Sequence, residues 1–348
     1  MTKLVIVATP MRRWVSRTIW RAWVVRIDRR KMLARLTKLG LSADARRSQL
    51  LSAREHFEQH NYLRLPGFID PALVRLVRRH MGGFVKTEHE VGSELRLSAS
   101  SVHTVFNVLM NDPILFRLIR RITGCGPIGC FYGRLYQLVA DRGQEFSWHS
   151  DLQDNRRVAI SINLSEAPYE GGTLQIRRRS RSAFESVPNL GVGDAIIFRV
   201  ARRLEHRVTP VVGKSSKIAF SGWFCSQPRY TSVHREMVAR SESTFAANRK
   251  HKRIAFPSPT DVVKIPNAIV SQTTGRETFV ANVGTGMCYG LNETGGRIWQ
   301  LMTHGRAIRS VSTAIADEYA APLREVESDV LGLAYQLAQR ELIKIVGR

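Results

Sequence analysis

The sequence lacks the features of a membrane protein and of a disulfide-stabilised one. No run of about 18 apolar residues occurs, so we expect no transmembrane helix. The four cysteines form no CxxC pair and no disulfide framework, which favours free thiols in a reducing compartment. The opening residues MTKLVIVATPMRR contain no long apolar core followed by a cleavage site. We therefore expect no signal peptide and a cytoplasmic location.

Acidic residues are scarce as well, but only in the N-terminal part of the chain. The 348 residues carry a formal net charge of +24. Residues 1–49 contain thirteen Lys or Arg and two Asp or Glu, whereas residues 261–348 contain nine of each kind. The excess over residues 1–260 suits an acidic peptide, a nucleic acid or a membrane surface. It is equally typical of a solvated, arginine-rich surface.

A chain of this length can hold two domains and bury a sizeable core. Charge and turn residues divide it into four parts. These are a basic N-terminal helical segment (1–49), a main domain (50–230), a basic linker with a helical first part (231–260) and a C-terminal domain (261–348). The N-terminal segment has helical periodicity over about 11–39, with three tryptophans among arginines. Such a helix could make a peripheral membrane contact, but packing on the next domain is favoured.

The two domains are both expected to be mixed α+β structures. In the main domain two capped helices, begun at Asp70-Pro71 and Asp112-Pro113, precede a series of short strands from Cys130 onward. Turns every 8–15 residues favour a double-stranded β-helix, or jelly roll, with flanking helices. In the C-terminal domain three strands are followed by three helices, an order that predicts a small winged-helix-like unit.

The sequence Trp148-His149-Ser150-Asp151 is the strongest candidate for a metal site. On a strand, His149 and Asp151 would share one face, and His206 on a later strand could reach the same point. Two imidazoles and one carboxylate on one side of a metal form the facial triad of non-haem Fe(II) oxygenases. A lone HxD pattern is common, so other motifs must support this hypothesis.

Those motifs are present in a fixed order: HxD, then GGT, GDAIIF, HRVTPV and KIAFSGWF. Over about 50–228 they resemble the 2-oxoglutarate- and Fe(II)-dependent dioxygenases, nearest to the prolyl-hydroxylase-like branch. The resemblance implies that His149, Asp151 and His206 hold Fe(II), that 2-oxoglutarate and O₂ are cosubstrates, and that ascorbate could assist. It also implies hydroxylation, because related halogenases replace the carboxylate at the position of Asp151 with a small residue and bind chloride there.

The same resemblance suggests two residues that bind 2-oxoglutarate. A basic residue at the start of the last core strand binds the distal carboxylate in this family, and Lys217 stands there. Lys214 is the alternative, because GKSSK carries a one-residue insertion. Lysine offers a point charge where the family often has arginine. Tyr136, thirteen residues before His149, matches a tyrosine that hydrogen-bonds the cosubstrate.

The C-terminal domain resembles the PqqD-like family, also called RiPP recognition elements. The similarity rests on GxxxxLNETGxxIW, a helix ending in DEY and a helix ending in LxxxxLI. In that family the unit binds the leader of a ribosomally made precursor peptide by β-augmentation. The groove would lie between residues 287–291 and a helix over 324–340. The alternative is a winged-helix unit that packs on the oxygenase and binds no peptide.

Taken together, these patterns predict a hydroxylase that modifies a side chain of a precursor peptide recruited through the PqqD-like domain. A small-molecule hydroxylase that uses this domain as a scaffold or carrier contact is the alternative. A nucleic-acid partner is not expected, because the C-terminal domain is neutral and affinity for nucleic acid depends on basic charge. Arg177, Arg178, Arg179, Arg181, Arg202 and Arg203 could line the mouth of the site or form a solvated edge.

Overall fold

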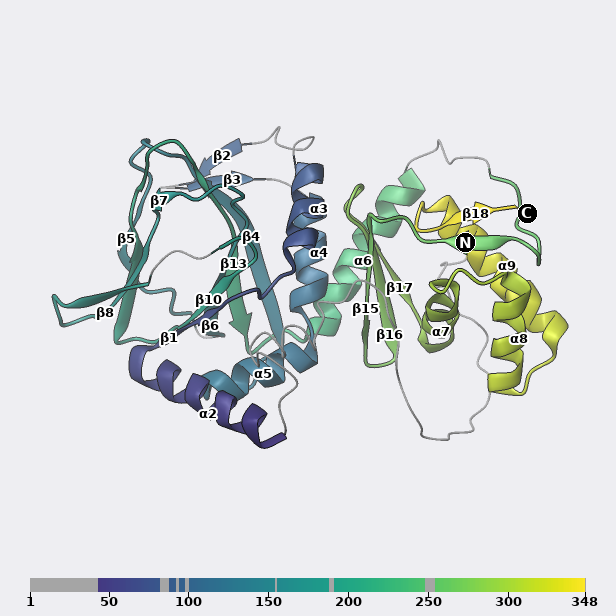
Figure 1. The fold of residues 1–348 in the computed structure, drawn as a ribbon, viewed down its shortest axis with the longest axis horizontal. Coiled ribbons are helices and arrows are strands. Elements are labelled where there is room, and N and C mark those ends of the chain that lie inside the picture. The colour runs from purple at the N-terminus through teal and green to yellow at the C-terminus, as the bar shows by residue number, and fades with distance from the viewer. Residues whose placement is uncertain are drawn as a thin grey trace. The chain divides into compact units, whose positions relative to one another are not determined.

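The structure is a computed structural model that describes residues 43–81, 88–91, 94–97, 100–153, 155–187, 191–247 and 254–347. The helix predicted over about 11–39 lies outside these residues. The chain forms two compact units that divide between Val233 and His234 (Figure 1). Within the described ranges, none of the helices combines the length and apolar character needed to cross a lipid bilayer.

The N-terminal unit contains helices that flank two antiparallel sheets. Its helices are α2 (Ala43–His60), α3 (Pro71–Met81), α4 (Ser100–Met110) and α5 (Pro113–Thr123). The larger sheet has the order β1-β10-β6-β13-β4-β3-β2, with bounds Tyr62–Leu65, Ala195–Arg199, Arg156–Asn163, Lys217–Cys225, Cys130–Leu138, Glu94–Leu97 and Glu88–Val91. The smaller sheet has the order β5-β11-β8-β9, with bounds Phe146–His149, Leu204–Val208, Leu174–Arg178 and Phe184–Val187. A two-stranded ladder joins β7 (Glu170–Gly171) to β12 (Val211–Val212).

The two sheets enclose one apolar cluster, which confirms the predicted jelly-roll core. Tyr136 and Ala219 contribute to it from the larger sheet, and Leu174 and Ile176 from the smaller sheet. The opposite face of the larger sheet is covered by helices: Phe106 of α4 stacks on Phe220 of β13, with ring centroids 4.6 Å apart. Alternation along β13 therefore separates side chains that line the space between the sheets from those that hold the helices.

Local sequence signals account for the ends of α5, the helix that precedes the strands. Asp112 is extended and accepts a hydrogen bond from the amide of Ile114 at 2.8 Å, and Pro113 occupies the first helical position. Gly124 ends the helix in the left-handed region, at φ 65°, where its amide bonds to the carbonyl of Arg120. The start at Asp112-Pro113 agrees with the sequence prediction.

The C-terminal unit has the predicted three strands followed by three helices. Strands β15 (Ile269–Thr274), β16 (Glu277–Asn282) and β17 (Met287–Leu291) form an antiparallel sheet. Helices α7 (Glu293–Met302), α8 (Ile308–Tyr319) and α9 (Leu323–Gln339) follow, and β14 (Val262–Lys264) pairs with β18 (Lys344–Val346). The core includes Trp299, whose indole donates to the Ser271 hydroxyl at 3.1 Å.

Helix α6 (Tyr230–Ala247) lies where a linker with a helical first part was predicted. From His234 onward its residues belong to the C-terminal unit. His234 is fully buried, and its ring centroid is 4.2 Å from that of Phe279 on β16. This part of α6 is thus a packed element of the unit. The domain limits given above stay a prediction.

We predict that Asn111→Ala lowers the free energy of unfolding by about 1–3 kcal/mol. The buried Asn111 side chain bonds both backbone groups of Phe131 on β4, accepting from its amide at 2.8 Å and donating to its carbonyl at 3.0 Å. Alanine would leave both groups without these partners. Urea denaturation measures the loss, with Gln59→Ala at an exposed position as the control. Equal effects of the two substitutions would contradict the prediction.

Candidate metal centre

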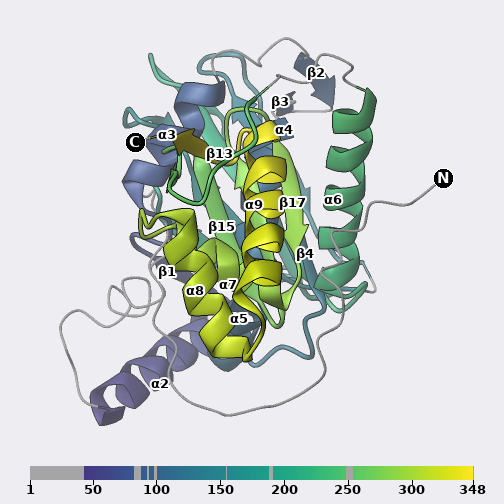
Figure 2. The same cartoon turned by 90° about the vertical axis from the view of Figure 1, so that its right-hand side faces the viewer.

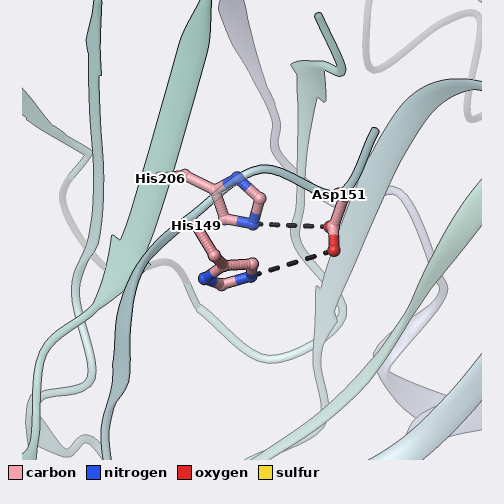
Figure 3. Close-up of side chains that lie close together, drawn as sticks. All are labelled: His149, Asp151 and His206. Atoms are coloured by element: carbon pink, nitrogen blue, oxygen red, sulfur yellow. Dashed lines mark ion pairs between the residues drawn. The ribbon is translucent and has the colours of Figure 1, made fainter. Parts of the chain in front are cut away.

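The structure brings the three predicted metal ligands together. His149 is the last residue of β5, and its Cα partner on β11 is His206. Their ring centroids are 4.3 Å apart. One ligand atom from each of His149, Asp151 and His206 can be chosen so that all lie within 4.8 Å of one another, and no other such cluster of three His, Cys, Asp or Glu occurs among the described residues. Figure 3 shows both imidazoles directed toward the carboxylate.

Asp151 reaches this point by a different route from the one the sequence suggests. Strand β5 ends at His149, so strand alternation does not place Asp151. Its carboxylate is held from the larger sheet instead. The indole of Trp223 donates to Asp151 Oδ2 at 2.8 Å, and the Arg156 guanidinium lies 3.6 Å from Oδ1 and donates to the Asp151 carbonyl at 3.2 Å. The same guanidinium stacks on the Trp223 ring, 3.7 Å from its centroid.

The imidazole of His149 is oriented by its own strand. Its Nδ1 lies 2.6 Å from the carbonyl oxygen of Ser147. Because a carbonyl only accepts, Nδ1 carries a proton, and Nε2 is the ring nitrogen available to a metal. Nε2 faces Asp151 Oδ1 at 3.8 Å, and Nε2 of the buried His206 lies 3.4 Å from Oδ2. Such a bond to the second ring nitrogen is the usual way in which a protein orients a metal-binding histidine.

The surroundings keep Asp151 ionised. Burial by itself would raise its pKa, but the hydrogen bond and charge of His206, the Trp223 indole and the charge of His149 together lower the pKa to about 2. The carboxylate is therefore charged throughout the neutral range.

This donor set fits Fe(II). Neutral imidazole nitrogens and a carboxylate oxygen are the ligands of the facial triad. Here the carboxylate is ionised and the Nδ1 contact of His149 leaves its Nε2 facing the carboxylate; a metal ion binding at the two Nε2 atoms displaces any proton on them. His149, Asp151 and His206 would hold the ion.

A pocket next to the triad contains the two residues predicted to bind the cosubstrate. It is lined by Tyr136, His149, Asp151, His206 and Lys217 together with mainly apolar side chains. Lys217 is the first residue of β13 and is only 6% exposed. Its ammonium donates to the carbonyl of Gly172 at 2.7 Å. The alternative, Lys214, is exposed and does not line this pocket.

The GGT motif explains how the lysine is accommodated. Gly172 has φ +58°, and a Cβ on it would lie 3.0 Å from Lys217 Cδ and 3.2 Å from the Tyr169 ring. Any larger residue would therefore press on the lysine stem as well as strain the backbone. The ring of Tyr169, whose pKa is raised by burial, has its centroid 5.8 Å from the ammonium. Gly172 and Tyr169 thus fix Lys217 in the pocket.

Trp223, Arg156 and Gly172 are site residues that the sequence analysis did not assign. For Trp223 a signal was available. Residues 217, 219, 221 and 223 alternate along β13, so the tryptophan must share the face of Lys217. No comparable pattern marks Arg156, because its position depends on how β6 meets the loop that contains Asp151.

Part of the predicted arginine cluster faces away from the triad. His206 and Ile176 are paired on neighbouring strands, with Ile176 in the core, so the next residue on each strand points to the outer face. There, Arg177 and Arg207 stack on the Trp148 ring, with guanidinium carbons 4.0 and 4.9 Å from its centroid. Arg177 therefore does not line the mouth of the site, contrary to one of the two readings of its sequence.

The predicted leader-binding groove of the C-terminal unit is bordered by α6. The amide of Cys288, on the edge strand β17, donates to the Ser241 hydroxyl of α6 at 2.8 Å. Arg340, directly after α9, pairs with Glu242 of α6 at 3.1 Å. The chain's own helix therefore contacts both walls of that groove.

Comparison with known proteins finds a family match in each of two separate parts of the chain. Residues 134–225 match the model of the 2OG-Fe(II) oxygenase superfamily, and residues 277–343 match that of Coenzyme PQQ synthesis protein D (PqqD). The first match includes Tyr136, Lys217 and the three residues of the metal cluster. A search of curated proteins found no match.

Several solved structures are similar to about half of the chain. A prolyl-4-hydroxylase from Pseudomonas putida is 17% identical, with 51% of this chain and 99% of that one covered and a TM-score of 0.39. A 2OG-Fe(II) oxygenase family oxidoreductase from Burkholderia pseudomallei is 12% identical (51% and 90% covered, TM-score 0.40). The epimerase SnoN from nogalamycin biosynthesis is 15% identical (51% and 82%, TM-score 0.42). On the family matches and the His-Asp-His cluster, the chain carries a 2OG-Fe(II) oxygenase domain and a PqqD domain.

Proposed function

We propose that this oxygenase hydroxylates a side chain of a ribosomally made precursor peptide that its PqqD domain recruits. The observation that supports it is the presence, in one chain, of a His-Asp-His cluster beside a buried lysine and of a PqqD match. The first feature suits oxidation with 2-oxoglutarate, and the second suits a peptide as the molecule that is oxidised. We propose the cytoplasm as the location.

In this proposal His149, Asp151 and His206 hold Fe(II). When bound, Fe(II) and 2-oxoglutarate supply an oxidation in which O₂ places one oxygen atom on the substrate and the other in succinate, with release of CO₂; ascorbate would only keep the metal reduced. Trp223 and Arg156 fix the carboxylate of Asp151 so that the ligand geometry is present before the metal binds.

Lys217 and Tyr136 bind 2-oxoglutarate in this proposal. The Lys217 ammonium donates to the neutral carbonyl of Gly172, a contact that does not neutralise its positive charge. An ammonium has three N–H donors, which leaves two for the distal carboxylate of the cosubstrate. The surrounding pocket wall is largely apolar, with Phe146, Leu174 and Val208 on it. A charge-assisted hydrogen bond is strengthened in such surroundings.

A small-molecule hydroxylase is the second candidate, and one observation favours it. Helix α6 occupies the edge of β17, where a leader strand would pair. If α6 never leaves that edge, the PqqD domain would act as a scaffold, and a free metabolite would be the substrate.

We predict that His206→Ala abolishes succinate formation from 2-oxoglutarate and lowers the iron content of the purified protein. Removing one of three ligands leaves a site with too few donors to hold the ion. The assays are succinate release and metal analysis of full-length protein. His304→Ala, at an exposed position in the other unit, is the control. Full iron loading of the His206 variant would contradict the assigned ligand set.

For Lys217→Ala we expect the KM for 2-oxoglutarate to rise about 10- to 100-fold, since a hydrogen bond to a charged group contributes about 1.5–3 kcal/mol. The iron content should stay unchanged. Lys214→Ala is the matched control, because it removes a lysine three residues away that is exposed. If the Lys214 variant alone raised KM, the carboxylate site would have to be reassigned.

The substrate class can be tested by mass spectrometry. A small precursor encoded beside this gene, co-expressed with the full-length protein, should gain 16 Da, and the gain should be absent with His206→Ala. Oxidation of a free metabolite by protein that lacks residues 261–348, with no change in any precursor, would instead support the small-molecule alternative.

A further inference from the structure

One edge of β17 has backbone amide and carbonyl groups that are not hydrogen-bonded to a neighbouring strand of its sheet. β17 is the outer strand of the sheet β15-β16-β17. Hydrogen-bonded pairs alternate along an antiparallel ladder, and the amide of Cys288 bonds to α6 rather than to β16. The backbone groups of Cys288, and of Gly290 two residues on, therefore point outward. An edge of this kind is a template for an added strand.

Helix α6 covers this edge with few contacts. Apart from the Ser241 hydroxyl on the Cys288 amide, Val238 lies over Gly290: a Cβ on that glycine would be 3.6 Å from Val238 Cγ2. Figure 2 shows α6 running alongside β17. A helix can offer only side-chain acceptors to a strand edge, whereas an extended peptide offers a carbonyl and an amide at every second residue. The hydrogen bonding of the edge is thus less complete with α6 than it would be with a strand.

A buried ion pair holds the other side of α6. The Arg340 side chain is 4% exposed, and its Nη2 lies 3.1 Å from Glu242 Oε2. Its guanidinium carbon is 4.5 Å from the ring centroid of Phe245 on α6 and 5.4 Å from that of Tyr289 on β17. A buried guanidinium that loses its carboxylate is strongly destabilising. Whatever replaces α6 must therefore bring an acidic group to Arg340.

Two buried polar atoms beside this pair have no partner within the described residues. They are Arg340 Nε and Gln336 Oε1. The two residues are four positions apart at the end of α9, so they lie on the same face of the helix. Arg340 Nε is a hydrogen-bond donor and Gln336 Oε1 is an acceptor. The backbone of a bound peptide could satisfy both, because its carbonyl accepts and its amide donates. Buried groups of this kind are normally hydrogen-bonded, so their state suggests a missing ligand.

We propose that α6 is a built-in cover of the β17 edge, and that a bound peptide displaces it only if that peptide brings a carboxylate to Arg340 in place of Glu242. The peptide pairs with the edge at Cys288 and Gly290, places a carboxylate on Arg340 where Glu242 now lies, and bonds Gln336 and Arg340 Nε through its backbone. The inference rests on the proposed function, because it states what a recruited precursor must carry.

The test uses the full-length protein and a variant, Glu242→Gln, that weakens the hold on α6 without altering β17 or α9. Glu236→Gln is the matched control, because Glu236 also lies on α6 but pairs with the exposed Arg240. In hydrogen–deuterium exchange, the amide of Cys288 should exchange at least tenfold faster in Glu242→Gln than in the wild type or the control. Equal exchange in all three would overturn α6 as a displaceable cover.

Binding is then measured by fluorescence anisotropy with two labelled peptides, VARSESTF, the sequence of residues 238–245, and VARSQSTF. Glu242→Gln protein should bind the acidic peptide VARSESTF at least tenfold more tightly than wild-type protein does. The same Glu242→Gln protein should bind the glutamine peptide VARSQSTF at least tenfold more weakly than the acidic peptide. This comparison changes only the peptide, so it is free of any folding defect. Equal binding of both peptides would overturn the role of Arg340.

Failure of this inference can be told apart from failure of the proposed function. If a co-expressed precursor gains 16 Da at the same rate with wild-type and Arg340→Gln protein, the inference is wrong and the proposed function stands. If no precursor is oxidised but the acidic peptide binds as expected, the surface is supported and the proposed substrate is not.

Discussion

The position of the Asp151 carboxylate is the constraint on which the metal centre depends. The two histidines are placed by the ladder between β5 and β11, but Asp151 lies beyond the end of its strand. Trp223 and Arg156, both on the larger sheet, hold its carboxylate. The third ligand is therefore in place only when the two sheets face each other, so the metal centre requires the folded jelly roll and cannot form on the smaller sheet alone.

The sequence contains enough information to predict the fold class and the residues that meet at the site. Alternating apolar residues and regularly spaced turns predict the strands, and the HxD pattern with a distant histidine predicts the cluster. The prediction that strand alternation places His149 and Asp151 on one face was wrong, because β5 ends at His149 and does not include the aspartate. Contacts between distant segments, such as Arg156 on the Trp223 ring, have no local signal and required the structure.

The C-terminal unit shows the same limit. Its three strands and three helices follow from turns and periodicity, and the structure confirms them. The packing of α6 could not be predicted, because its sequence is polar and has no continuous apolar face. Beyond the buried His234, which packs on Phe279, the helix is held by single contacts: a hydroxyl on one amide, a valine over a glycine, and one buried ion pair. The part of α6 beyond His234 therefore has few apolar contacts to lose on displacement, which is what a replaceable cover requires.

The pocket beside the metal cluster explains why selection of a substrate would fall to another surface. Its polar groups are the candidate ligands, Lys217, Tyr136 and a few others, and most of its remaining lining is apolar. An apolar wall distinguishes related substrates only weakly. A second binding surface on the same chain raises the effective concentration of a captured peptide at the first, without new contacts there. Under the proposed function, the charge on Arg340 would then decide which peptide is oxidised, and the metal cluster would decide how.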